Sequence, residues 1–476
     1  MQTPVRRRTR IIKWRSSASI MPTTTFARHP SVASSFLGQL SPADMTRVMQ
    51  HPAQEQNVSV VAALIRGLRS CRTLAAYDEL QRRLFQVLYS REEHKSQARR
   101  CAHRLARGKS LPTPLPQLPP SANPDDPDTW RIEDLVFDRV CRQLRAVGDG
   151  IAWRASGYDR RYVIAVSSNA SPGPMAGKSG LPHELGAAAE LRNRGGFGLL
   201  HDLTNCLRIG DITEFKPDGS KLLYEIKSSP TAKTGPQRRR MEAAVQAALT
   251  GGELPGRPGQ RIVVPPARCR THIRTFAAGI NAAMTRGIAA VNISNSRTLT
   301  AISYSTMART RAGDTPAQVT ADFNAQRQAA LNRAGIDSML HHVRVASTTR
   351  NHDFVPSVIP FALFPLPPLQ AALLICDYIC FDLTIAPERI TRKLASYGIT
   401  PTVPLPPANS ELVATDTVLT LSRGSGELRL HPGALYELLI ETLDLVTWAQ
   451  ASAEVLDDPN CPPHPVVALS TTRVWC

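Results

Sequence analysis

The chain has 476 residues, which suggests about three domains and gives ample length for large hydrophobic cores. Lysine and arginine outnumber aspartate and glutamate by 57 to 39, a formal net charge of +18, and a surplus of this size favours polyanionic partners, nucleic acid first. The most apolar run, residues 358–379, contains four prolines and is interrupted by Asp377, so we expect no membrane-spanning helix and no membrane partner.

The first 40 residues are basic and polar, and we expect them to form a disordered arm. This segment is either a solvated tail or an arginine-rich arm that binds DNA. The nine cysteines are odd in number and lack CxxC or other framework spacing, so we expect buried thiols rather than a zinc site. This cysteine usage favours the reducing cytoplasm.

A helical region is predicted over residues 41–109. Ser41, Pro42 and Asp44 form a typical helix start, and apolar residues then recur at helical spacing. The region is rich in arginine, and we favour a scaffold over a DNA-facing module. Residues 110–128 form a proline-rich linker that cannot pack as the interior of a helix or sheet, so it separates two units.

Beyond the linker, residues 130–147 are predicted to form an amphipathic helix and residues 161–166 a buried strand. The sequence GPMAGKS at residues 173–179 then looks like a phosphate-binding loop. Walker spacing requires glycine where Pro172 stands, and Pro182 delays the following helix. We therefore expect an ordinary glycine- and proline-rich loop and not a nucleotide site.

The next helix is predicted from its apolar residues, which recur at helical spacing behind a proline suited to a first turn: Leu181, Leu185, Ala188 and Leu191. Glu184 lies at the edge of this apolar face, whereas Glu190 projects on the opposite side. We therefore expect Glu184, and not Glu190, to reach the neighbouring sheet.

A hairpin follows, and its turn sets the strand register. The sequence Lys216-Pro217-Asp218-Gly219 fits a three-residue loop that closes with glycine in the left-handed region. Counting back along both strands places Asp211 opposite Glu225, with Cβ atoms roughly 4.5–5.5 Å apart. Strand alternation puts Lys227 on the face of Glu225 and turns an apolar set to the other face, namely Ile212, Leu222, Tyr224 and Ile226.

Two carboxylates this close repel each other unless a cation lies between them, and hard oxygen ligands suit Mg²⁺ or Mn²⁺. Such an ion, with the Lys227 ammonium, would neutralise charge on a phosphodiester. The alternative is a surface hairpin with a cross-strand carboxylate pair and a solvated lysine, which is the commoner fate of a single motif of this kind.

A further helix is predicted after the hairpin. Gln237 extends its apolar stripe by one turn at the end nearest the strand of Lys227, and the other members of the stripe are Met241, Ala244, Val245, Ala248 and Leu249. Arg238, Arg239 and Arg240 follow the glutamine and are placed to meet phosphates. A solvated helix start is an equal alternative for these arginines.

Residues 181–249 resemble the PD-(D/E)XK nuclease superfamily in the order of their elements. A helix with a glutamate is followed by a strand with an aspartate, a strand with a Glu-x-Lys pair and a helix with a glutamine. This superfamily includes restriction endonucleases, Holliday-junction resolvases and recombination nucleases. The resemblance covers about residues 181–265. It implies an α/β fold, with a restriction-endonuclease-like mixed sheet flanked by helices, which we place in residues 129–310. Gly210 stands where the family has a proline before the aspartate.

The same resemblance implies roles for the residues of the motif. Asp211 and Glu225 would be ligands of Mg²⁺ or Mn²⁺, and Lys227 would be the charge stabiliser. Glu184 would be an outer metal-shell or water-orienting carboxylate. Gln237 would be a helix residue that supports the site.

The remaining elements alternate between strands and helices, as in a sheet with flanking helices. We predict strands over 261–264, 288–293, 299–304 and 379–385, helices over 271–286, 315–335 and 432–456, a buried loop over most of 358–379, and a hairpin of 418–421 with 427–430. No group of chemically reactive residues is apparent beyond residue 310. We expect residues 311–476 to form an α+β accessory domain for target selection, contact with a partner protein or homodimer formation.

Two classes of function fit these features. The first is a metal-dependent DNA endonuclease that hydrolyses phosphodiester bonds in a restriction, defence or mobile-element setting. The alternative is a non-catalytic, basic nucleic-acid-binding or assembly protein that retains a nuclease-like core. We favour the enzyme, because a retired site has no physical reason to keep two mutually repelling carboxylates beside Lys227.

Overall fold

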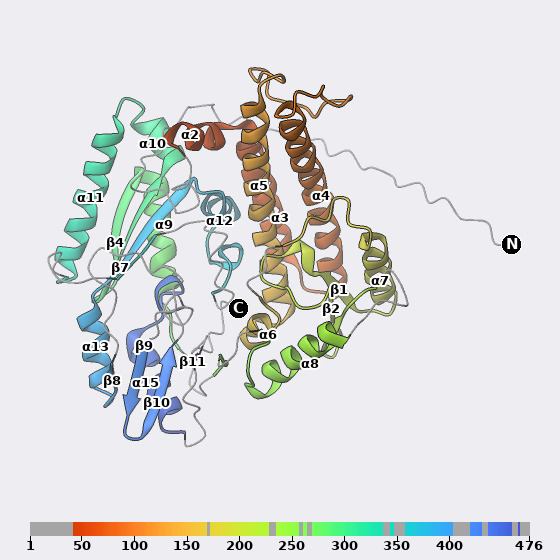
Figure 1. Cartoon of the computed structure of the whole chain (residues 1–476). Coiled ribbons are helices and arrows are strands. Elements are labelled where there is room, and N and C mark those ends of the chain that lie inside the picture. The colour runs from red at the N-terminus through yellow and green to blue at the C-terminus, as the bar shows by residue number, and fades with distance from the viewer. Residues whose placement is uncertain are drawn as a thin grey trace.

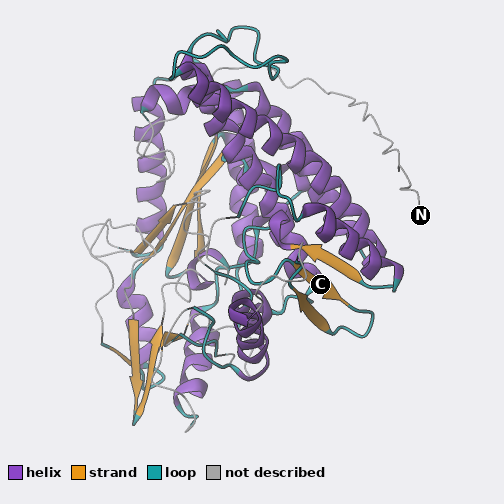
Figure 2. Ribbon diagram, turned by 45° about the vertical axis from the view of Figure 1, so that its right-hand side comes forward, coloured by secondary structure: helices purple, strands orange, loops and turns teal. Residues whose placement is uncertain are grey.

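The described part of the chain has a mixed α/β structure with three small, separate sheets (Figures 1 and 2). The computed structural model describes residues 41–168, 172–227, 235–256, 260–263, 269–336, 343–346, 358–402, 419–430, 437–458 and 465–466. The basic arm expected over residues 1–40 therefore lies outside the described residues.

Four helices form the N-terminal part: α2 (Pro42–Gln50), α3 (Pro52–Ser70), α4 (Leu74–Leu105) and α5 (Pro127–Ala155). A side chain caps the start of each helix. The predicted cap Ser41 accepts from the N–H of Asp44 at 3.1 Å, and α3 is capped by Nδ1 of His51, which accepts from the N–H of Ala53 at 3.2 Å. Helices α4 and α5 pack along each other and are joined by the proline-rich segment. Helix α5 continues eight residues beyond the predicted end at 147, to Ala155, and buries residues on nearly every side.

The strand predicted over 161–166 is wrong, because this segment forms the short helix α6 (Arg160–Ala165). The Asp159 side chain accepts the N–H of Tyr162 at 3.2 Å and so caps the first turn. A short apolar run alone cannot distinguish a buried strand from a buried helix, and here the cap favours the helix.

The predicted hairpin belongs to a three-stranded antiparallel sheet, in the order β1 (Phe197–Leu200), β2 (Ile212–Phe215) and β3 (Lys221–Tyr224). Its register is confirmed, since Ile212 pairs with Tyr224 and the N–H of Lys216 donates to the carbonyl of Ser220 at 3.0 Å. Leu222, predicted to face the core, is exposed instead, on the edge strand β3, which is less buried than the other edge strand β1.

Helix α7 (Leu181–Asn193) packs against this sheet at Gly198, and α8 (Gly235–Thr250) packs mainly against α6. The apolar stripe predicted on α8 is partly wrong. Val245 and Leu249 are exposed, whereas Ala244 and Ala247 are buried. The small alanines allow α8 to lie close to α6, and this contact rotates the buried face away from the larger residues.

A second sheet has the order β4 (Ile288–Ser294), β5 (Arg297–Ser303), β7 (Ile379–Ile385) and β6 (Val343–Ala346). Helix α9 (Ile273–Arg286) packs on one face through Gly279, while Phe323 of α11 (Pro316–Arg333) packs on the other; α10 (Tyr304–Thr310) follows β5. Figure 1 shows this sheet and α11 on the opposite side of α3 and α5 from α7 and α8.

The expectation that β4 and β5 share a mixed sheet with the hairpin is wrong. Strands β5 and β7 are buried along their whole length, so each needs a partner on both sides, and they pair with each other. Strand pairing therefore crosses residue 310, where we expected a domain boundary. In the segment predicted as a strand over 261–264, Arg261 forms only an isolated bridge to Glu253, and position 264 lies outside the described residues.

The C-terminal elements are the 3-10 helix η4 (Phe361–Leu363), the helices α12 (Pro368–Ile375), α13 (Pro387–Ala395) and α15 (Leu445–Leu456), and a third sheet of β8 (Thr400–Pro401), β9 (Leu419–Arg423), β10 (Gly426–Leu430) and β11 (Pro465–Val466). The hairpin of β9 and β10 confirms the prediction.

Two predictions here are wrong. The apolar run expected as a buried loop contains α12, which starts at Pro368 because proline is tolerated in a first turn. The closing helix is interrupted before α15, where Thr442 has a φ of +51° and Leu443 forms a bridge to Thr271. In the part of the chain that the structure describes, no helix combines the length and apolar character needed to cross a membrane.

Candidate nuclease-like site

Asp211 and Glu225 lie at the open end of the β2–β3 hairpin. Asp211 directly precedes β2 and Glu225 directly follows β3, so the confirmed register places the two residues across from each other. The backbone N–H of Asp211 donates to the carbonyl of Tyr224 at 2.8 Å. The N–H of Ile226 donates to Oδ2 of Asp211 at 2.7 Å, which turns this carboxylate toward the end of β3.

Lys227 forms an ion pair with Oε1 of Glu225, as expected for residues on one face of an extended segment. Burial raises the pKa of Asp211 above its ordinary value, and the neighbouring Glu225 carboxylate raises it further. The N–H of Ile226 opposes this rise. The pair therefore has the like-charge proximity that the register predicted.

Glu184 is buried on α7, whereas the side chain of Glu190 is 72% exposed, so the predicted orientation of this helix is confirmed. Burial raises the pKa of Glu184, and Asp211 and Asp202 add to the rise while Lys178 opposes it. Leu185, expected on the buried face, is exposed. Glu184 thus belongs to the same electrostatic neighbourhood as Asp211.

Two members of the site were missed from the sequence, Lys178 and Asp202. Asp202 lies in the 3-10 helix η2 (His201–Leu203), directly after β1. Nζ of Lys178 lies 2.8 Å from Oε1 of Glu184 and 2.7 Å from Oδ2 of Asp202. Burial alone would lower the pKa of Lys178, but the two carboxylates raise it above its ordinary value. We call the four acidic side chains, Glu184, Asp202, Asp211 and Glu225, the carboxylate cluster.

The signal for Lys178 was present in the sequence. It is the lysine of the GPMAGKS loop, which we expected to be an ordinary connection, and it stands six residues before Glu184. The sequence gives a weaker indication that Asp202 belongs to the site, namely its position just after the apolar residues of β1.

A buried histidine supports the backbone in front of Asp211. His201 lies with Nδ1 2.9 Å from the carbonyl of Gly210 and Nε2 2.7 Å from the hydroxyl of Thr213. A carbonyl can only accept, so Nδ1 carries the proton and Nε2 accepts from Thr213. The hydroxyl of Tyr162 completes the chain at 2.5 Å from that of Thr213. These contacts hold the strand start in one position.

The geometry of the chain at position 210 requires glycine. Its φ is +81°, whereas the proline ring fixes φ near about −65°. A Cβ at this position would also lie 3.0 Å from the carbonyl oxygen of Tyr224. Glycine therefore permits the turn that brings Asp211 onto β3.

Gln237 is half-buried in the first turn of α8, and no described residue forms a hydrogen bond with its side chain. Met241, one turn later, reaches to 3.8 Å from the position that a Cβ of Gly210 would occupy, so the face of α8 that carries Gln237 is turned toward the site. Arg238, Arg239 and Arg240 are exposed. Arg238 pairs with Glu242, and Arg239 donates to the carbonyl of Gly235 at 3.3 Å.

The donor set suits a hard divalent cation. Mg²⁺ is commonly held by one or two carboxylates together with water and substrate phosphate, and Asp211 and Glu225 supply such oxygens. Among the described residues, no three His, Cys, Asp or Glu side chains gather closely enough to form a metal centre by themselves. The two lysines take up carboxylate oxygens instead. With formal charges, the four carboxylates and the ammonium groups of Lys178 and Lys227 sum to −2, the charge that one divalent ion balances.

Comparison of the chain with known protein families, with curated proteins and with solved structures gave no match.

Proposed function

We propose that the protein is a metal-dependent DNA endonuclease that hydrolyses phosphodiester bonds at the carboxylate cluster. The observation that carries this proposal is the strand register, which sets Asp211 across from Glu225 and leaves Lys227 paired with Glu225. A structural hairpin has no need for two opposed carboxylates, one of which, Glu225, raises the pKa of the other, Asp211. The buried Glu184 adds a third carboxylate from a different element.

Each residue has a distinct role in this proposal. Asp211 and Glu225 would hold Mg²⁺ or Mn²⁺, which would neutralise charge on the phosphodiester and lower the pKa of a water molecule. Lys227 would donate to a phosphate oxygen as negative charge grows on it. Glu184 would orient water at the cluster, and Gln237 would support the site from α8.

The substrate class follows from charge. The net charge of +18 favours a polyanion, and Arg238, Arg239 and Arg240 are exposed on the first turns of α8. A helix N-terminus also favours phosphate, because its N–H groups point outward. DNA is therefore the substrate that we propose.

The first test is incubation of the purified full chain with supercoiled, linear and single-stranded DNA in Mg²⁺, Mn²⁺ or EDTA. Asp211→Asn should abolish metal-dependent nicking. Lys227→Ala should lower the nicking rate by about 10²–10³-fold with a smaller loss of DNA affinity, because this ammonium acts mainly on the transition state. Gel-shift binding at low salt should survive both changes, since the remaining basic surface supplies it.

A matched pair on α7 serves as the control. Glu184→Gln should reduce nicking, whereas Glu190→Gln removes an exposed carboxylate from the same helix and should leave the nicking rate unchanged. Unchanged nicking by Asp211→Asn would remove the nuclease proposal from this hairpin. DNA binding without nicking in any metal would favour the non-catalytic alternative.

A further inference from the structure

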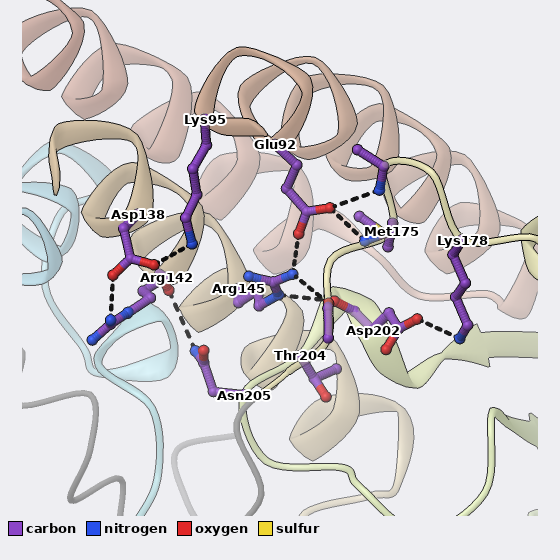
Figure 3. A network of polar contacts seen from close by, with 12 residues as sticks. Glu92, Lys95, Asp138, Arg142, Arg145, Met175, Lys178, Asp202, Thr204 and Asn205 are labelled. Atoms are coloured by element: carbon purple, nitrogen blue, oxygen red, sulfur yellow. Dashed lines mark hydrogen bonds and ion pairs between the residues drawn. The ribbon is translucent and has the colours of Figure 1, made fainter. Parts of the chain in front are cut away.

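Lys178 reaches the carboxylate cluster from a loop and not from the sheet. Its ammonium lies between α7 and η2, within hydrogen-bond distance of Glu184 and Asp202. Figure 3 shows the Lys178 side chain extending to Asp202. The partners of Lys178 are distant from it in the sequence, whereas Lys227 pairs with Glu225, two residues away along the chain.

The loop that carries Lys178 is held by a buried ion pair between two long helices. Glu92 of α4 accepts the N–H groups of Met175 and Ala176 at 2.6 and 3.2 Å with one carboxylate oxygen. Its other oxygen pairs with Arg145 of α5. Glu92 and Arg145 are both buried. A carboxylate that has lost its water needs such partners, so the backbone at 175–176 is fixed by the interior of the molecule.

Arg145 also fixes the position of Asp202, which accepts from Lys178. Nε of Arg145 donates to the carbonyl of Asp202 at 2.9 Å (Figure 3). Gly177 then turns the loop with a φ of +83°, and the N–H of Lys178 donates to the carbonyl of Met175 at 3.0 Å. The buried Glu92–Arg145 ion pair therefore sets the positions of both Lys178 and Asp202, so their contact is fixed by the tertiary structure.

We propose that Lys178 is a built-in cation of the carboxylate cluster that takes the place of a second divalent ion. This inference rests on the proposed function insofar as the cluster binds a metal at all. Enzymes that cleave phosphodiesters often hold two ions about 3.5–4 Å apart, and a lysine ammonium is a compact charge that can balance two carboxylates in the same way. Lys178 then leaves room for a single divalent ion at Asp211 and Glu225.

The experiment is a titration of the full chain with Mn²⁺ in the absence of DNA, followed by calorimetry and by the electron paramagnetic resonance of free Mn²⁺. Wild type should bind one ion per chain. Lys178→Met should bind an additional ion, or bind its ion at least about tenfold more tightly, because the cluster gains one unbalanced negative charge. Lys178→Arg should behave as wild type, since it retains the charge.

Lys95→Met is the matched control. Lys95, on helix α4, likewise pairs with a carboxylate, that of Asp138, and its side chain is 24% exposed against 31% for Lys178. It lies outside the carboxylate cluster, and its substitution should leave Mn²⁺ binding unchanged. Thermal unfolding with and without Mn²⁺ gives a second measure, in which Lys178→Met should gain more stability from the ion than wild type.

The outcomes separate this inference from the proposed function. Equal numbers of Mn²⁺ ions and equal affinities in wild type and Lys178→Met would overturn the role of Lys178, even where wild type nicks DNA. Stronger or additional binding in Lys178→Met would support it, even where no DNA substrate is cleaved. Absence of Mn²⁺ binding in both proteins would overturn it as well.

Discussion

At the scale of single residues, His201 shows how one buried side chain sets the site. Burial lowers its pKa to about 3, and the nearby Arg208 contributes to the shift. The ring is therefore neutral, as its hydrogen bonds to Gly210 and Thr213 require. Protonation would place a hydrogen on Nε2, which must accept from Thr213. Protonation of His201 at low pH should therefore lower the free energy of unfolding.

The sign of the pH dependence follows from linkage. The unfolded histidine has a pKa of about 6.5 and binds a proton that the folded one rejects, so stability is complete above about pH 6.5 and is lost as pH falls toward about 3. Between pH 7 and 5, wild type should lose roughly 1–2 kcal/mol more unfolding free energy than His201→Gln. Denaturant unfolding at several pH values measures this difference. His183→Gln, at an exposed histidine of α7, should keep the wild-type dependence, and a His201→Gln profile parallel to wild type would contradict the assignment.

The sequence predicts only part of the site, for a physical reason. Asp211, Glu225 and Lys227 are linked through one turn, so local counting is enough to place them. Lys178 and Asp202 meet only because Glu92 and Arg145, on two other helices, hold the loop. The GPMAGKS motif marks Lys178 in the sequence, but a contact that depends on tertiary packing leaves no spacing that would pair this lysine with Asp202.

At the scale of elements, helix α5 depends on a close approach at Gly148. A Cβ on this residue would lie 1.8 Å from the carbonyl oxygen of Leu203. The neighbouring Asp149 is buried and accepts the N–H groups of Asn205 and Cys206 at 2.7 and 2.8 Å. Helix α5 therefore carries the loop that leads from η2 to Asp211.

Gly148→Ala should force α5 and this loop apart and destabilise the protein by roughly 1–3 kcal/mol or more, the usual range for overpacking. Nothing lies within 4 Å of a Cβ built on Gly186 in α7, so Gly186→Ala should stabilise by roughly 0.5–1 kcal/mol through helix propensity. Thermal unfolding of both variants tests the pair. A Gly148→Ala protein as stable as wild type would mean that the approach is looser than the structure shows.

Elements were predictable where local signals agreed. The capping box at Thr315 marks the start of α11, and the alternating residues of β9 and β10 mark their hairpin. Prediction failed for α6 and α12, which are short apolar runs of eight residues or fewer. The run at α6 carries no period that separates helix from strand, so tertiary packing decides between them. In the run that contains α12 we expected a loop because of its prolines, but Pro368 is accommodated in the first turn of the helix.

At the scale of the whole molecule, buried ion pairs join the site region to the C-terminal part. Arg139 of α5 pairs with Asp377, and Arg160 at the start of α6 lies 3.1 Å from Glu437 and 2.8 Å from Glu441. One hydrophobic core also extends from Val48 to Leu456. Helix α6 in turn carries Tyr162, the first member of the chain that ends at His201 and Gly210. The C-terminal elements are therefore part of the support of the site.

Arg160→Met should lower stability by roughly 3–5 kcal/mol, because it leaves two buried carboxylates without their cation. Arg99→Met is the control: the Arg99 side chain is 67% exposed in its pair with Asp134, and such pairs contribute about 0–1 kcal/mol. Combining Arg160→Met with Glu437→Gln and Glu441→Gln should recover much of the loss, because no uncompensated charge remains. Thermal unfolding and limited proteolysis of the four proteins measure these effects. If Arg160→Met destabilises no more than Arg99→Met, the C-terminal part does not brace the site through this ion cluster, and its contribution is then limited to the shared hydrophobic core.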